Sequence, residues 1–175
     1  MIRIVAIRVV DRIKESGNTQ KVLTTHSDLI LARLGFHELN EMVCSREGYI
    51  VLQLRNDHEA CSAFMNDLKG IYGIEIKELL LCDSQPEQEN VPAGAKVTLA
   101  AVKILDRHEI VTKVQKVLSL YGCSIRTRMG INLGAESGNQ GLIILELCGD
   151  IDQINSLAAR LSSLENTCSG LIWFG

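Results

Sequence analysis

Apolar and polar positions along this 175-residue chain follow one order that occurs twice. Val10-Asp11-Arg12 returns 95 residues later as Leu105-Asp106-Arg107, with no gap. At an offset of 93, Gly48–Leu54 returns as Gly141–Leu147. Several matches at nearly one offset are hard to obtain by chance. Because two copies are too few for a solenoid, the pattern predicts a tandem duplication of a compact unit of about 80 residues.

Each copy predicts the element order β-α-β-β-α-β. Residues 2–10 and 97–105 are apolar on both alternating faces, which is typical of a central strand. A helix follows, whose apolar stripe in the second copy is Val111, Val114, Val117, Leu118 and Tyr121. The stripe is weaker in the first copy, where the same positions hold Ser16, Thr19, Val22, Leu23 and His26.

The remaining elements follow the same alternation. Second strands are expected over residues 30–36 and 125–131, third strands over 48–54 and 141–147, and last strands over 74–81 and 168–174. The second helices are expected to begin at Asp57 and Asp150, since a short acidic side chain accepts hydrogen bonds from the free N–H groups of a first turn.

This order predicts an α+β protein made of two tandem ferredoxin-like sandwiches, each an antiparallel sheet with two helices on one face. Residues 82–95 hold both prolines of the chain, Pro86 and Pro92, in a polar and acidic stretch. Proline neither continues a helix nor donates to a β-ladder, so this stretch is interpreted as a linker. The expected domains are residues 1–81 and 96–175.

The sheet face without helices is expected to be apolar as well. On the first strand, either Ile2, Ile4, Ala6 and Val10 or Arg3, Val5, Ile7 and Val9 face the helices, and the other set is still mostly apolar. A large exposed apolar face usually marks an interface. We expect the two copies to pair their sheets or to join them edge to edge, and further homo-oligomerisation is a natural extension.

Composition narrows the class of protein. Hydrophobic residues make up 46% and charged residues 22%, as in globular domains. A net charge of −3 and 4% aromatic residues disfavour a nucleic-acid surface. No apolar run reaches the roughly 18 residues of a membrane span, and the first residues are interpreted as a strand rather than a signal peptide. Six cysteines without paired C-x-x-C spacing favour reduced thiols in the cytoplasm.

Catalytic motifs are absent from the sequence, and we expect neither an enzyme nor a cofactor. Imidazole and thiolate groups in the first copy would suit a transition metal; they belong to His37, Cys44, His58 and Cys61. The second copy has no matching set, so the prediction is that no metal is bound.

The Asp-Arg steps and the Arg-x-Gly sequences recur in both copies. The candidate ligand-binding residues are therefore Asp11, Arg12, Arg33, Gly35, Asp106, Arg107, Arg128 and Gly130. One interpretation is structural, with Asp capping a loop and Arg in an exposed ion pair worth less than about 1 kcal/mol. The other is a pocket for a carboxylate or small anion at the strand-to-helix turn, where free N–H groups and an arginine fork converge.

The stretches His26-Ser-Asp-Leu-Ile-Leu-Ala-Arg-Leu-Gly-Phe36 and Tyr121-Gly-Cys-Ser-Ile-Arg-Thr-Arg-Met-Gly-Ile131 carry a family resemblance. With the repeated units and the Asp at the first turn, they resemble the ACT-domain superfamily of small-molecule-sensing regulatory modules. More narrowly, they resemble the single-domain iron-only hydrogenase system regulators, which are similar in fold to the C-terminal domain of nickel-responsive repressors. The resemblance implies two ACT-like domains that cover nearly all of the chain outside residues 82–95.

The chain departs from that pattern in two places. Amino-acid-binding ACT domains usually have a Pro-Gly turn after the acidic residue, which Asp11-Arg-Ile and Asp106-Arg-His lack. The histidine-rich cluster of the nickel sensor is absent, so its metal site is not carried over. No segment is left over to read DNA, and a regulator of transcription built this way would act through a partner.

The resulting hypothesis is a non-enzymatic regulatory protein that senses a small ligand or binds a protein partner, with a link to hydrogenase regulation implied by the resemblance. The alternative is a structural interaction module that assembles oligomers without a ligand. An enzyme on this scaffold is a third alternative, because a fold does not determine a function.

Overall fold

The computed structural model describes residues 1–37, 45–82, 89–133 and 138–175. The chain forms two compact units. We call Ile2–Leu80 the first unit and Leu81–Gly175, together with Met1, the second unit. No helix in the described parts of the chain has the length and the apolar character needed to cross a membrane.

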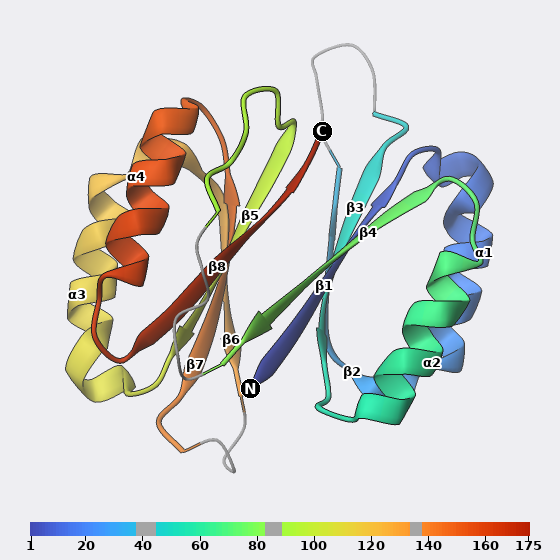
Figure 1. Ribbon diagram of the computed structural model, residues 1–175, viewed down its shortest axis with the longest axis horizontal. Coiled ribbons are helices and arrows are strands. Elements are labelled where there is room, and N and C mark those ends of the chain that lie inside the picture. Colours follow the sequence, from blue (N-terminus) through green and yellow to red (C-terminus); the bar gives the residue numbers. More distant parts are fainter. Residues whose placement is uncertain (38–44, 83–88, 134–137) are drawn as a thin grey trace. The chain divides into compact units, whose positions relative to one another are not determined.

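The first unit has the predicted element order. Its elements are β1 (Ile2–Val9), α1 (Arg12–Thr25), a short 3-10 turn (Ser27–Leu29), β2 (Ile30–Phe36), β3 (Gly48–Leu54), α2 (His58–Lys69) and β4 (Ile74–Leu81). The strand order in the sheet is β2-β3-β1-β4, so β2 is an edge strand and β1 is central. Helices α1 and α2 cover one face of this sheet (Figure 1).

The second unit repeats that arrangement. Its elements are β5 (Val97–Ile104), α3 (Arg107–Leu120), a 3-10 turn (Gly122–Ser124), β6 (Ile125–Asn132), β7 (Gly141–Leu147), α4 (Ile151–Ser162) and β8 (Thr167–Phe174). Its strand order is β6-β7-β5-β8, with α3 and α4 on one face of the sheet (Figure 1). The predicted fold class, two ferredoxin-like sandwiches in one α+β chain, is confirmed.

The duplication extends to local irregularities. The register of β2 against β3 shifts between Ile30 and Ala32, and that of β6 against β7 shifts between Ile125 and Thr127, which are 95 residues further on. An irregularity repeated at the same place bends the edge strand in the same way in both sheets. The two copies therefore share strand pairing as well as element order.

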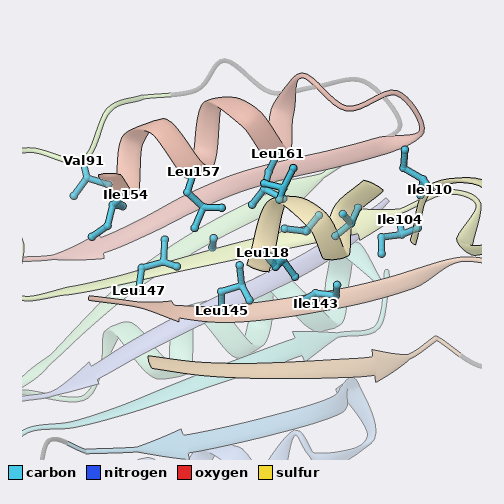
Figure 2. Close-up of a cluster of buried hydrophobic side chains, with 14 residues drawn as sticks. Val91, Ile104, Ile110, Leu118, Ile143, Leu145, Leu147, Ile154, Leu157 and Leu161 are labelled. Atoms are coloured by element: carbon cyan, nitrogen blue, oxygen red, sulfur yellow. The ribbon is translucent and has the colours of Figure 1, made fainter. Parts of the chain in front are cut away.

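Each unit has its own core between sheet and helices. In the first unit Val5, Ile7 and Val9 of β1 pack in the same cluster as Phe64 and Leu68 of α2. The odd-numbered residues of β1 therefore face the helices, which settles the choice that the alternation left open. Figure 2 shows the second core, where Leu157 and Leu161 of α4 lie over Leu145 and Leu147 of β7.

One predicted stripe position is wrong. Val111 is 42% exposed, whereas its neighbour Ile110 is 2% exposed and belongs to the core. The sequence stripe was placed one residue late at the start of α3, because the first turn presents Ile110 rather than Val111 to the sheet. Val114, Val117 and Leu118 are buried as expected.

Part of the stretch interpreted as a linker packs on the second unit. Val91 is 3% exposed and belongs to the second core (Figure 2). Its backbone N–H donates to Asn155 Oδ1 of α4 at 2.9 Å, and Asn155 Nδ2 donates back to its carbonyl oxygen at 3.5 Å. The amide side chain thus holds Val91 in place as a peptide group would.

Candidate functional site

The Asp-Arg steps tie the start of each first helix to the segment before the third strand. Asp11 is the N-cap of α1 and accepts from Ile13 N at 3.1 Å, and its other oxygen faces Arg46 Nη1 at 3.3 Å. Arg12 Nε donates to the Ser45 carbonyl oxygen at 2.9 Å. These contacts give the aspartate a structural role in capping and loop attachment.

The second unit repeats these contacts with different partners. Asp106 caps α3 by accepting from His108 N at 2.9 Å, and it also accepts from Asn139 Nδ2. Arg107 Nε donates to the Asn139 carbonyl oxygen at 3.4 Å. Asn139 therefore stands where the first unit has Arg46, and an amide replaces an ion pair.

Glycines give the two arginines room. A Cβ at Gly48 would lie 3.6 Å from Arg12 Cδ, and one at Gly141 would lie only 3.1 Å from Arg107 Cδ. Both glycines open a third strand, β3 or β7. The side chain of the arginine passes over the strand at the point where no side chain obstructs it.

The second pair of predicted arginines links the edge strand to the first helix. Arg33 Nη1 donates to Gln20 Oε1 at 2.9 Å, and Arg128 Nη1 donates to Gln115 Oε1 at 2.6 Å. Both contacts connect residues 13 apart, on β2 and α1 or on β6 and α3. This bridge is a shared structural feature of the two copies.

A pocket of about 520 Å³ lies beside α1 in the first unit. We call it the α1 pocket. Predicted residues Arg12, Arg33 and Gly35 line it, whereas Asp11 does not. Helix α1 contributes four more lining residues, which are Ser16, Gly17, Thr19 and Gln20. The strands contribute Val9, Phe36, Gly48, Tyr49 and Ile50, and His37 follows β2.

Thr19 is one of the lining residues of the α1 pocket that the sequence did not predict, and it differs from the others in its buried polar group. It is 2% exposed, and its hydroxyl oxygen has no hydrogen-bond partner among the described residues. A buried hydroxyl that is left unpaired costs about 1–3 kcal/mol. The available signal was the weak stripe of the first helix, in which Ser16 and Thr19 interrupt the apolar period.

The pocket carries positive charge. Arg12 and Arg33 line it, and none of the described lining residues is an aspartate or a glutamate. The second unit holds the predicted residues Arg107, Arg128 and Gly130 at matching positions, but its first helix has Val111, Thr112 and Val114 in place of Ser16, Gly17 and Thr19. Val114 is 1% exposed and belongs to the core.

Another arginine of the first unit is held by carboxylates outside this pocket. Arg8 donates to Glu47 through Nε at 3.1 Å and through Nη2 at 2.9 Å, and to Glu75 through Nη1 at 3.4 Å. The hydrogen bonds to Glu47 raise the pKa of Arg8, and they outweigh its burial, which lowers it. Arg8 is therefore a structural cation.

The weak metal candidates are not brought together in the described residues. Cys61 is 1% exposed and its thiol donates to the Arg55 carbonyl oxygen at 3.5 Å, while His58 is exposed at the start of α2. His37 lines the α1 pocket, and Cys44 lies outside the described residues. Within the described ranges, no three His, Cys, Asp or Glu residues are grouped as metal ligands.

His26 takes part in a side-chain pair that the second unit replaces. His26 Nε2 lies 2.7 Å from Asp67 Oδ2, between the ends of α1 and α2. The equivalent positions hold Tyr121 and Arg160, whose guanidinium carbon lies 5.9 Å from the centre of the tyrosine ring. A histidine–aspartate contact in one copy corresponds to a cation–π contact in the other.

Comparison with known proteins gives no family for the chain. No family model matches it, and no curated protein does. Among solved structures, it is similar to an uncharacterized protein from Thermotoga maritima, with 28% identity over 45% of this chain and 92% of that one and a TM-score of 0.39.

Two further solved structures are similar over almost the whole chain. An unknown protein from Galdieria sulphuraria has 15% identity, covers 99% of this chain and 98% of its own, and has a TM-score of 0.36. The acetolactate synthase small subunit from Thermotoga maritima has 10% identity, coverage of 99% and 96%, and a TM-score of 0.35. The fold assignment rests on the element order and strand pairing of this chain, not on these likenesses.

Proposed function

We propose that this chain is a non-enzymatic regulatory protein with two ACT-like domains, residues 1–81 and 96–175, that senses a small ligand. The observation that carries the proposal is the α1 pocket, which combines open space, two arginines and an unpartnered buried hydroxyl at Thr19. Pockets of roughly 300–1,000 Å³ with a few polar groups are typical of small-molecule sites.

The finer parts of this proposal are a role in hydrogenase-related regulation, a cytoplasmic location and a homo-oligomeric state. The first comes from the resemblance of residues 26–36 and 121–131, the second from the cysteine pattern and the third from the predicted apolar sheet face. Hydrogenase maturation genes beside the gene for this chain would support the first. A genome neighbourhood without any hydrogenase function would count against it.

The experiment that tests ligand sensing measures the melting temperature of the full chain with a panel of amino acids and small anions, with monocarboxylates such as octanoate among the anions. A ligand that binds only the folded state stabilises it by RT ln(1 + [L]/Kd), or about 2.7 kcal/mol at one hundred times Kd. Arg33→Ala should remove the response and Arg128→Ala should keep it, because only Arg33 lines the α1 pocket. A flat response of the wild type across the panel would contradict sensing.

The alternative function is a structural interaction module without a ligand. The predicted apolar sheet faces would supply its assembly surface, and the arginine–glutamine bridge, repeated within each unit, gives Arg33 and Arg128 a structural role that needs no ligand. Light scattering on the Arg33→Ala, Arg128→Ala double variant separates the two functions. An unchanged mass with a lost ligand response supports sensing, whereas an altered mass supports assembly.

A further inference from the structure

Two small residues leave space along α1. Ser16 and Gly17 line the α1 pocket, and a Cβ built at Gly17 meets no atom within 4 Å. The matching residues of α3 are larger, namely Val111 and Thr112. Helix α3 of the second unit can therefore be compared directly with α1, because it has larger side chains at the same two positions. From this difference we expect one ligand site per chain rather than two.

The two arginines of the α1 pocket are hydrogen-bond donors. Arg12 uses Nε to bond the Ser45 carbonyl oxygen, and Arg33 uses Nη1 to bond Gln20. A guanidinium has further N–H donors, and neither guanidinium has another hydrogen-bond partner among the described residues. The hydroxyl of Thr19 adds a third group in need of a partner. Such a set matches an acceptor with two oxygens, which is a carboxylate.

The remaining surface of the pocket is largely apolar. Val9 is 3% exposed and Ile50 packs against the first core, and both line the pocket. With no aspartate or glutamate among the described lining residues, the α-ammonium group of an amino acid has no charged partner there. Burying an ammonium without a partner is costly, so the lining disfavours a zwitterion.

We propose that the α1 pocket binds a small monocarboxylate with an apolar body, not an amino acid. Arg12, Arg33 and the Thr19 hydroxyl bind the carboxylate, and the body of the ligand lies against Val9 and Ile50. This inference rests on the proposed function, since it names the chemical class that the sensing site takes.

The test is isothermal titration calorimetry of the full chain with three eight-carbon probes that differ in their charged head group. Octanoate should bind at one site per chain. Octylammonium should show no binding. 2-Aminooctanoate should bind at least about tenfold more weakly than octanoate, because burying its ammonium group without a charged partner costs at least that much affinity. Equal affinity for octanoate and octylammonium, or two octanoate sites per chain, would overturn the proposal.

Variants locate the site. Ser16→Val with Gly17→Thr copies the second unit into α1 and should weaken octanoate binding by about tenfold or more through lost space. Val111→Ser with Thr112→Gly is the matched control and should leave octanoate binding unchanged. Thr19→Val keeps the side-chain volume and removes the hydroxyl, so it should weaken binding severalfold with the melting temperature kept or raised. Unchanged binding in both α1 variants would place octanoate elsewhere and refute the proposal.

The outcomes separate this inference from the proposed function. If octanoate does not bind but another compound of the panel does, and Ser16→Val with Gly17→Thr abolishes that binding, the ligand class is wrong and sensing stands. If no compound binds to the wild-type chain, both the ligand class and sensing are wrong. Circular dichroism of each variant confirms that a loss of binding is not a loss of fold.

Discussion

Single residues adopt special backbone conformations at equivalent places in the two units. Gly73 has a φ of 78° and Asn166, 93 residues later, has a φ of 56°. The carbonyl oxygens of both accept from the residue after the first strand, from Val10 N and from Leu105 N, each at 2.9 Å. Asparagine is among the few residues other than glycine that tolerate this left-handed region.

Asn166→Val should therefore lower the free energy of unfolding by about 1–2 kcal/mol, because a β-branched side chain is strained at positive φ. Asn166→Gly is the matched control and should change stability much less. Both variants lose the hydrogen bond from Asn166 Nδ2 to Glu109 Oε2, so their difference reports the backbone alone. Urea denaturation measures it, and equal stability of the two variants would refute the argument.

Among the elements, α1 and α3 occupy the same position in the two units but differ in the composition of their first half. Helix α1 contains Ser16-Gly-Asn-Thr19 where α3 contains Val111-Thr-Lys-Val114, and glycine and asparagine have a lower helix propensity than the threonine and lysine that replace them. Thr24 and Thr25 also bond back to the carbonyl oxygens of Gln20 and Lys21. Tertiary packing by Leu23, which is 2% exposed, compensates for this weak local preference.

Gly17→Ala should raise the free energy of unfolding by about 0.5–1 kcal/mol, since alanine restricts the unfolded chain and its Cβ meets no atom within 4 Å. The reverse change at the matching position, Thr112→Gly, should destabilise α3. Chemical denaturation of the two variants beside the wild type checks both signs. A loss of stability on Gly17→Ala would show that the helix needs glycine there for a reason other than space.

At the scale of the whole molecule, the two cores share no residue. The core of the first unit runs from Val5 to Leu68, and that of the second runs from Val91 to Leu161. Phe64→Ala should cost about 3–5 kcal/mol, because Phe64 is fully buried and its removal leaves a cavity. Leu157→Ala is the equivalent change in the second core, at about 2–5 kcal/mol.

Amide hydrogen exchange measures the effect of these two variants on the stability of each unit separately. Phe64→Ala should speed amide exchange first in β1 and β3, and Leu157→Ala first in β5 and β7, because local stability follows the core on which each strand packs. An equal loss of protection in all four strands with either variant would contradict two separate cores.

Much of the fold could be predicted from the local pattern of apolar and polar residues. Alternation with period 2, stripes near period 3.6 and short acidic caps at Asp57 and Asp150 were enough to predict the order of the elements. The offset between the copies predicted that both halves fold alike. Val111 was misplaced because a stripe of five residues fits two adjacent rotations of a helix almost equally well.

Fewer residues of the candidate site could be predicted from the local sequence pattern. The recurrence of Arg12 and Arg33 marked them as candidates, and both line the α1 pocket. Recurrence also marked Asp11, whose carboxylate instead caps α1 and faces Arg46. It could not mark Thr19, because the second copy has valine there and a repeat search favours what the copies share.

The order of strands and helices, the duplication and the helix caps are properties of neighbouring residues, and the amino-acid order is sufficient to establish them. Three other features depend on residues tens of positions apart. They are the face of β1 that meets the helices, the pairing of carboxylates with arginines, and the space that is left along α1. Those contacts form only when the sheet and its helices pack, since side-chain volume and hydrogen-bond geometry then select among partners that the linear sequence leaves equivalent.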